Sequence, residues 1–214
     1  MIFELLFIAF FLASVIALIG ALIAMLRGKV RLGKRLLLSL AGFWTVYLLI
    51  VVLVSIATPQ QRIPMGKERC FDEMCFIVAH AETASKLGLG GQTVQANGRF
   101  YVVAVRVTSR SRGRAQSEGG LRALLLEAGK SYEVSPSGEQ AWKAANGETA
   151  SLTTRLEPGE SVTTVQVFDI PAGASTPGLV LTHGFTPGYF VIGESPIFRE
   201  PTLMRIEPDG GGGL

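Results

Sequence analysis

The sequence predicts a mainly β outer domain, an antiparallel β-sandwich of seven or eight strands, preceded by an α-helical transmembrane hairpin. Three observations lead to this prediction. Residues 1–58 hold two long uncharged segments. The rest of the chain alternates short β-branched or aromatic segments with turn residues, a pattern typical of all-β domains. The chain is 48% hydrophobic and 17% charged, whereas charged residues make up about a quarter of a soluble domain.

The two uncharged segments are each long enough to cross a bilayer. Residues 5–26 and 36–58 comprise 22 and 23 residues without a charge. At about 1.5 Å per residue each helix would be roughly 33–35 Å long, which exceeds the ~30 Å hydrocarbon core. We therefore expect a hairpin over residues 1–58, with helices at 3–26 and 36–58. A cleaved signal peptide is the less favoured alternative, because no basic residue precedes the first segment.

The connection between the segments sets the expected topology. Residues 27–35 hold five basic residues, Arg27, Lys29, Arg31, Lys34 and Arg35. Positive charge beside helix ends keeps a short loop on the cytoplasmic side. We therefore expect a multi-pass protein of the bacterial inner membrane, in contact with the lipid bilayer, whose N-terminus and C-terminal domain are extracytoplasmic. Residues 59–214 carry 15 basic and 16 acidic residues, so the pI near 9.0 belongs to the hairpin and indicates no nucleic-acid partner.

Small residues recur on the first helix at four-residue spacing, a pattern that lets helices pack closely. They are Ala13, Ala17 and Ala21, with Gly20 and Ala24 beside them. Packing within the hairpin and docking onto another membrane protein both remain open. Neither segment contains an internal ionisable residue, which argues against an ion-coupled transporter.

The outer part divides into a linker at 59–69, a domain at 70–207 and a glycine-rich tail at 208–214, which we expect to be disordered. Alternation is clearest where Tyr101, Val103, Val105 and Val107 share one face, as in a half-buried strand. We expect one or two helical turns at 140–145 and an exposed mobile loop at 109–120. The predicted strands are 75–81, 99–108, 121–127, 132–134, 161–170, 179–183, 189–192 and 203–206.

Four pieces of the outer domain carry a resemblance. They are GRFYVVAVRV at 98–107, LEPGESV at 156–162 followed by VFDIP at 167–171, GLVL at 178–181, and GESPIFR at 193–199. Together they resemble the bacterial telokin-like, Ig-like extracytoplasmic domains of unknown function. The resemblance implies an Ig-like sandwich over about 70–206 and carries over no catalytic residues. The two-helix anchor and the basic loop at 109–120 depart from the family's frequent form.

Cys70 and Cys75 are the only cysteines. An even count outside the cytoplasm favours a disulfide, which would join the linker to the first predicted strand. A thiol-exchange site is the less favoured alternative, since the spacing is not C-x-x-C and two acids lie between the cysteines.

Catalytic and cofactor signals are weak along the whole sequence. His80 and His183 are the only histidines, and no spacing typical of zinc ligands surrounds them. The sequence has no serine-nucleophile frame around Ser195 and no phosphate-binding loop around Gly88. We therefore expect no metal, no cofactor and no catalytic residues.

Four arginines, Arg106, Arg110, Arg112 and Arg114, are the most distinctive exposed feature expected of the outer domain. They are candidates for contact with an anionic partner such as a phosphate headgroup or an acidic glycan; a solvated loop is the alternative. The sequence thus favours a non-enzymatic, membrane-anchored envelope protein whose outer domain binds or scaffolds a protein or envelope polymer. An accessory subunit of a membrane complex is the second hypothesis. An envelope enzyme using His80 or His183, or a redox protein, is the third.

Overall fold

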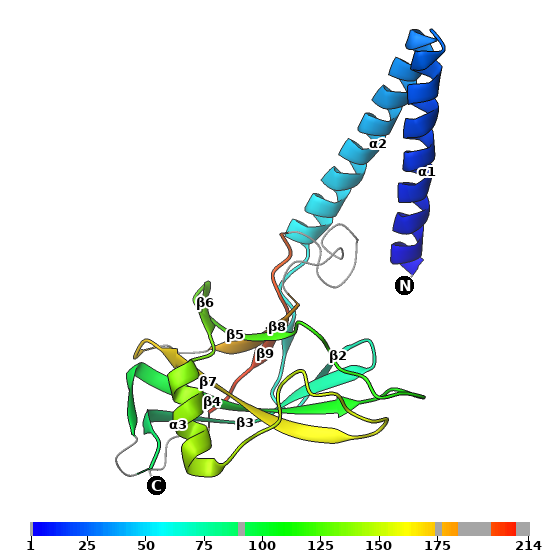
Figure 1. Cartoon of the computed structure of the whole chain (residues 1–214). Coiled ribbons are helices and arrows are strands. Elements are labelled where there is room, and N and C mark those ends of the chain that lie inside the picture. The colour runs from blue at the N-terminus through cyan, green and yellow to red at the C-terminus, as the bar shows by residue number, and fades with distance from the viewer. Residues whose placement is uncertain (1, 90–92, 174–176, 184–197, 209–214) are drawn as a thin grey trace. The chain divides into compact units, whose positions relative to one another are not determined.

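The structure is a computed structural model that describes residues 2–89, 93–173, 177–183 and 198–208 (Figure 1). The chain forms two compact units, one holding the helices and the other the strands. The predicted fold class is confirmed: two apolar N-terminal helices precede a β-sandwich of two sheets.

Helix α1 (Ile2–Leu26) and helix α2 (Val30–Ala57) are joined by a turn of only three residues. Gly28 supplies the reversal at φ +79°, a backbone conformation that glycine adopts without steric cost. Helix α2 begins six residues before the uncharged segment at 36–58, so Arg31, Lys34 and Arg35 lie in its first two turns. Arg and Lys are good helix formers, so the helix does not end where the apolar segment does.

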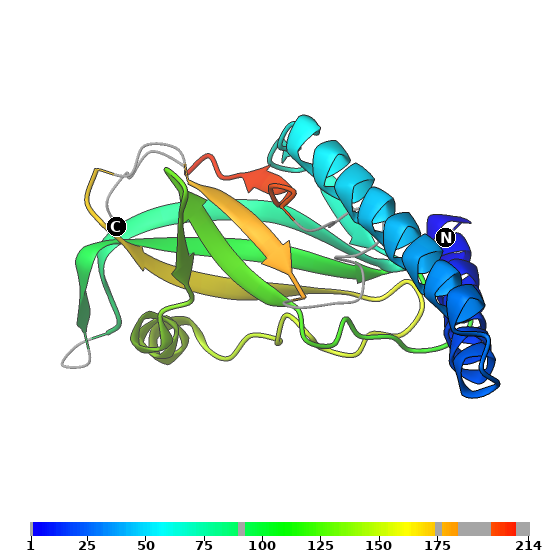
Figure 2. The same ribbon diagram turned by 90° about the horizontal axis from the view of Figure 1, so that it is seen from above.

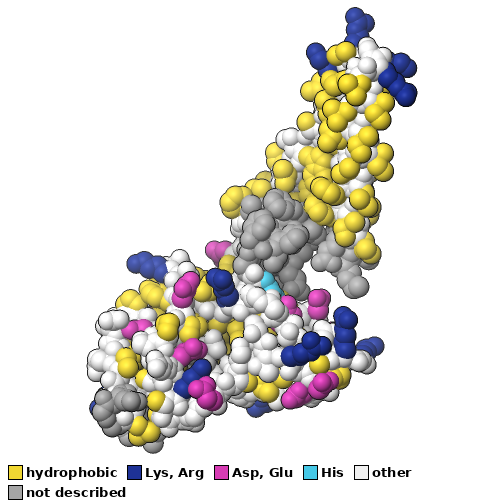
Figure 3. All heavy atoms as spheres, viewed as in Figure 1, with side chains coloured by type: hydrophobic (Ala, Val, Ile, Leu, Met, Phe, Trp, Pro, Cys, Tyr) yellow, Lys and Arg dark blue, Asp and Glu magenta, His cyan; other side chains and the backbone are white. Residues whose placement is uncertain are grey.

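The two helices pack through small residues at the turn and aromatic residues further along. Ala21 is fully buried, and a Cβ at Gly33 would collide with Met25 and with the Ala21 carbonyl. Trp44 Nε1 donates a hydrogen bond to Ser14 Oγ at 3.1 Å. Apolar side chains cover the visible surface of the hairpin and basic ones gather at its turn (Figure 3).

Length and composition qualify both helices to cross a membrane. Two such helices at the N-terminus indicate a membrane anchor or a signal sequence.

The strands form two sheets. One has the order β2-β3-β4-β7 and is antiparallel throughout; the other has the order β1-β9-β8-β5-β6 and is antiparallel except for the parallel pair β1–β9. Figure 2 shows β8 (orange) running beside β5 (green) in the second sheet. The strands are β1 (Arg62–Ile63), β2 (Glu68–Phe71), β3 (Met74–Leu87), β4 (Val94–Ser109), β5 (Arg122–Glu127), β6 (Lys130–Glu133), β7 (Ser161–Ile170), β8 (Gly178–Thr182) and β9 (Leu203–Arg205).

The main core lies between the sheets and follows the predicted alternation. Tyr101, Val103, Val105 and Val107 of β4 all point into it. The opposite face of β4 is also partly buried, because helix α3 (Pro136–Asn146) covers one end of that face. There Phe100 and its neighbours form a second apolar cluster. β4 is therefore apolar on both faces over part of its length.

Most predicted strands match the structure in place, and β7 matches at both ends. Strands β3 and β4 are longer than predicted, and α3 extends well beyond the expected turn at 140–145. The expected linker at 59–69 contains β1 and the start of β2. The predicted strand 189–192 and most of the tail 208–214 lie outside the described residues.

Turn chemistry accounts for the tight connections. Ala128 and Gly129, between β5 and β6, have φ of +48° and +78°, the pair of signs that a type I′ hairpin turn requires. Gly159 has φ +80° and reverses the chain before β7, as the PGES motif predicts.

Candidate functional site

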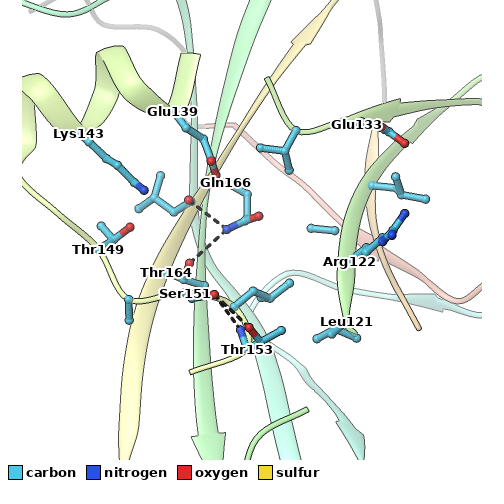
Figure 4. Close-up of a pocket in the computed structure, with 16 residues that line it drawn as sticks. Leu121, Arg122, Glu133, Glu139, Lys143, Thr149, Ser151, Thr153, Thr164 and Gln166 are labelled. Carbon is cyan, nitrogen blue, oxygen red and sulfur yellow. Dashed lines mark hydrogen bonds between the residues drawn. The ribbon is translucent and has the colours of Figure 1, made fainter. Parts of the chain in front are cut away.

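A cavity of about 530 Å³ opens on the side of the sandwich between β7 and the β5–β6 hairpin. Helix α3 and the segment at 149–153 supply the rest of its wall (Figure 4). Its volume falls within the ~300–1,000 Å³ of small-molecule sites. Apolar side chains of the main core, Leu121, Ala123 and Leu152, form part of the lining.

Helix α3 is fixed beside the cavity at its N-terminal end. The backbone N–H of Ser135 donates to the Val167 carbonyl of β7 at 2.7 Å. The Ser135 hydroxyl caps the helix by accepting from the Gly138 N–H at 3.2 Å, which satisfies one of the free donors of the first turn. Pro136 occupies the start of the helix, where its fixed φ suits the first turn. The helix position is thus tied to an edge strand.

Gly138 allows α3 to lie directly on β7 and β4. A Cβ at this position would stand 2.7 Å from Val167 Cγ1 and 3.1 Å from Phe100 Cε1. Both of these side chains are essentially unexposed. The close approach carries Glu139 and Lys143, four residues apart and therefore on one face, to the wall of the cavity.

Two polar residues of β7 point inward and line the cavity. Val162, Phe168 and Ile170 of the same strand pack on the inter-sheet core, and Thr164 and Gln166 occupy the alternate positions between them. Gln166 Nε2 donates to Thr164 Oγ1 at 3.2 Å and to the Val165 carbonyl at 3.1 Å. Thr164 is only 1% exposed. The two polar residues on the inward face of β7 therefore form part of the cavity wall.

The charged groups of the cavity lie on two sides (Figure 4). Glu139 and Lys143 of α3 stand near Gln166, whereas Arg122 of β5 and Glu133 of β6 lie across the opening. Burial raises the pKa of the Glu139 carboxyl, because desolvation penalises its charged form, and Lys143 offsets only part of this effect.

Lys143 also pairs with the exposed Glu148 at 3.6 Å. Hydroxyl groups of Thr149, Ser151 and Thr153 complete the polar rim.

The predicted disulfide is present. Cys70 of β2 and Cys75 of β3 are directly paired across the hairpin and bonded with an S–S distance of 2.01 Å. It joins the first two strands of one sheet, as the sequence predicts for the linker and the first strand. Glu68 lies close enough to form a possible metal-ligand group with both sulfurs, but disulfide-bonded sulfurs are not thiolate donors.

The four arginines predicted to meet an anionic partner do not form one group of uncommitted charges. Arg110 donates to both carboxylate oxygens of Glu68, at 2.7 and 2.8 Å. Arg106 is exposed on β4, where its paired neighbours are Ile77 and Thr163. Arg112 and Arg114 are exposed in the loop that follows β4.

The sequence predicts a mobile loop at 109–120, but backbone hydrogen bonds hold this loop at several points. The Arg110 N–H donates to the Glu73 carbonyl at 2.7 Å. Gln116 pairs with Leu156 through two backbone hydrogen bonds. The carboxylates of Glu68 and Glu73 accept hydrogen bonds from Arg110 and Gln116 of this loop, and their negative charge reduces the positive potential available to an anionic ligand.

His80 lies on β3 of one sheet and His183 directly follows β8 of the other, and neither is among the described residues that line the cavity. His80 is exposed on β3 beside Glu82. His183 Nε2 lies 2.7 Å from Glu118 Oε1, and its ring stacks edge-on against Phe71 with centroids 4.8 Å apart. The His183–Glu118 pair ties the loop after β4 to the end of β8, which is a structural role.

No sequence motif marks the cavity residues, since they come from β5, β6, α3, β7 and the segment at 149–153. One signal was readable: Thr164 and Gln166 interrupt the apolar alternation of residues 162–170. The sequence does not say which face of that strand points inward, nor which elements stand opposite it.

No protein-family model and no curated protein matches this sequence. Several solved structures are similar in part. A conserved hypothetical protein of Bacillus anthracis has 16% identity and a TM-score of 0.47, covering 57% of this chain and 92% of its own. A secreted protein of Mycobacterium tuberculosis has 13% identity and a TM-score of 0.44, covering 71% of this chain and 100% of its own.

An uncharacterized β-sandwich protein of Clostridium difficile has 12% identity and a TM-score of 0.42, covering 70% of this chain and 96% of its own. At these identities and scores nothing about a site or an activity follows for this chain. The telokin-like resemblance stays an expectation from sequence.

Proposed function

We propose that the chain is a non-catalytic, membrane-anchored binding protein of the bacterial cell envelope. The helical hairpin holds it in the inner membrane with its basic turn in the cytoplasm. The β-sandwich lies on the extracytoplasmic side, where its cavity binds part of a protein or envelope polymer. The observation that carries the proposal is the polar cavity on the open side of the sandwich, whose α3 wall is fixed to β7 at Ser135 and Gly138.

The cavity lining supports a binding role. Its described residues offer hydroxyls, one amide, two carboxylates and two cations, which are the kinds of group that orient a polar ligand in a pocket. The disulfide supports the extracytoplasmic location, since disulfides persist mainly in oxidising compartments.

Photo-crosslinking in intact cells tests this proposal. A benzophenone amino acid replaces Thr149 at the rim of the cavity, and the matched control replaces the exposed Glu82 on β3. We expect crosslinked species at position 149 and none at position 82. Crosslinking at neither position, or equal crosslinking at both, would contradict a binding site in the cavity.

Thiol trapping in the same cells tests the topology. Blocking free thiols before lysis should leave Cys70 and Cys75 unlabelled until a reductant is added. Labelling of both cysteines without reductant would place the domain in the reducing cytoplasm and overturn the proposed orientation.

The second candidate function is that of an accessory subunit of a membrane complex, and small residues on the hairpin surface favour this role. Ala17, Ala21 and Ala24 are buried or half-buried, whereas Ala13 and Gly20 are exposed on α1. Gly20→Leu therefore alters the outer surface without filling the hairpin interface. Loss of a co-purifying membrane protein in this variant, but not in Ala13→Ser, would support the subunit role; unchanged recovery of partners would argue against it.

A further inference from the structure

The polar groups of the cavity differ in what they offer a ligand. Both amide protons of Gln166 are already used by Thr164 and Val165, as the hydrogen-bond network orients the amide. Its carbonyl Oε1 has no hydrogen-bond partner among the residues that the structure describes. Gln166 therefore presents an acceptor, which a ligand with N–H or O–H donors would satisfy.

Glu139 adds a second acceptor on the same side (Figure 4). Its carboxyl is half-buried in the wall of the cavity. Lys143 is its neighbour on the helix, but that ammonium also pairs with Glu148 at 3.6 Å. Desolvation makes ionised Glu139 unfavourable by itself, so a cation placed beside it would gain a charge-assisted hydrogen bond of the stronger kind.

Arg122 stands across the opening from these acceptors (Figure 4). It is exposed on β5 and makes no ion pair within the described part of the chain. A guanidinium binds carboxylates through two parallel hydrogen bonds. The cavity thus places paired acceptors at one side and an uncommitted carboxylate-binding group at the other, and Leu121 and Leu152 add apolar surface to the same lining.

We propose that the cavity binds a short peptide, with its N-terminal ammonium against Glu139 and Gln166 Oε1 and its C-terminal carboxylate toward Arg122. This inference rests on the proposed function, because it names the ligand class of the same cavity. A neutral sugar would hydrogen-bond to these groups but leave their charges without a counter-charge, and a simple anion would meet two acceptors on the α3 side.

Calorimetric titration of the full chain in detergent micelles tests the ligand class. The probes are alanyl-alanine, its N-acetyl form, its C-terminal amide, and glucose. We expect alanyl-alanine to bind, acetylation to weaken binding by about tenfold or more, and amidation to weaken it less, because Arg122 is exposed. Equal binding of the acetylated peptide would overturn the role of the ammonium.

Variants locate the binding. Glu139→Gln removes the negative charge and Gln166→Met removes the amide acceptor, each with little change in side-chain volume, and we expect each to weaken alanyl-alanine binding by about tenfold. Glu82→Gln, outside the cavity, is the matched control and should leave binding unchanged. Thermal unfolding of each variant shows whether it remains folded. Unchanged affinity in both cavity variants would overturn the inference.

The pH dependence gives an independent readout. Protonated Glu139 no longer pairs with an ammonium, so affinity should fall as the pH drops through the pKa of Glu139. The other charged groups that line or flank this cavity are Lys143, Glu148, Glu133 and Arg122. Glu139→Gln should lose the part of this fall that lies above the pKa of the peptide's own carboxylate, about 3.5, and a fall that persists there at higher pH would be assigned to Glu133 or Glu148.

The remaining outcomes separate this inference from the proposed function. Binding of glucose that Gln166→Met abolishes, without binding of alanyl-alanine, would overturn the peptide and keep the cavity as a binding site. No binding of alanyl-alanine at any pH would overturn the inference alone. The proposed function is judged by crosslinking in cells, which uses no chosen ligand.

Discussion

Replacing Gly138 by alanine has two opposing effects on stability, a gain in helix propensity and a loss from overpacking. Alanine is favoured over glycine within a helix by at most about 1 kcal/mol. At Gly138 the new methyl group would stand 2.7 Å from Val167 Cγ1 and 3.1 Å from Phe100 Cε1. A real Cβ does not sit this close to a carbon atom, so the helix or its neighbours must move.

The neighbours have little freedom to move. Val167 is 0% exposed and Phe100 is 1% exposed, and the β-branched valine has restricted χ1 rotamers. Overpacking in such surroundings costs about 1–3 kcal/mol. Subtracting the propensity gain of at most about 1 kcal/mol leaves a loss of about 0–2 kcal/mol in the free energy of unfolding, and we expect Gly138→Ala to lie in the upper half of this range because both neighbours are buried. The melting temperature of a domain of this size should fall by ~2–4 °C for each of these kcal/mol.

The fluorescence of Trp142, on the same helix, reports the change directly. The chain has two tryptophans, so Trp44→Phe serves as the background for urea and thermal unfolding in micelles. Gly113→Ala is the matched control, because its added Cβ meets nothing within 4 Å, and we expect it to be neutral within about 0.5 kcal/mol. Equal or higher stability of Gly138→Ala would refute the argument that α3 is held in contact with β7 at this residue.

Three further predictions concern turns, sheet ends and charge. Ala128 has φ +48°, so Ala128→Asn should raise the free energy of unfolding by about 0.5–1 kcal/mol in chemical denaturation; a decrease would contradict the turn assignment. Asp169 accepts hydrogen bonds from the backbone N–H groups of Asn97 and Gly98 at 2.9 and 3.2 Å. Asp169→Ala should therefore lower the free energy of unfolding by about 1–3 kcal/mol and speed amide exchange at this end of β4, and unchanged exchange would contradict this prediction. Burial raises the pKa of Glu139 in the folded protein, so folding favours the protonated carboxyl and stability falls as the pH rises through that pKa. Glu139→Gln should therefore be more stable than the native chain at neutral pH but not at acidic pH. A stability gain that does not depend on pH would contradict this explanation.

The local patterns of this sequence predict most of its elements. Alternation along residues 101–107 identifies β4, because every second side chain of a strand meets the same environment. Two long uncharged segments identify the helices, since few soluble folds use such segments. The start of α2 and the short strands β1 and β2 were not predictable in this way. A helix extends into polar sequence when its residues form helices well, and a short strand depends on a partner that comes later in the chain.

The cavity depends on contacts that local patterns do not contain. Its acceptors come from β7 and α3, and Arg122 comes from β5 in the other sheet. Gly138 is one of 25 glycines, and only its contact with Val167 and Phe100 explains why glycine is needed there. The arginines at 106–114 show that a cluster in the sequence need not be a cluster of free charges, because Arg110 forms an ion pair with Glu68 from β2.

Composition, periodicity and residues only a few positions apart predict an apolar helical hairpin with a basic turn, a β-sandwich, and a disulfide between Cys70 and Cys75. The inward orientation of Thr164 and Gln166 and the contact of α3 with β7 became visible only in the folded domain. The physical reason is that a side chain's burial and partners are set by the elements packed against it, and those elements are distant in sequence.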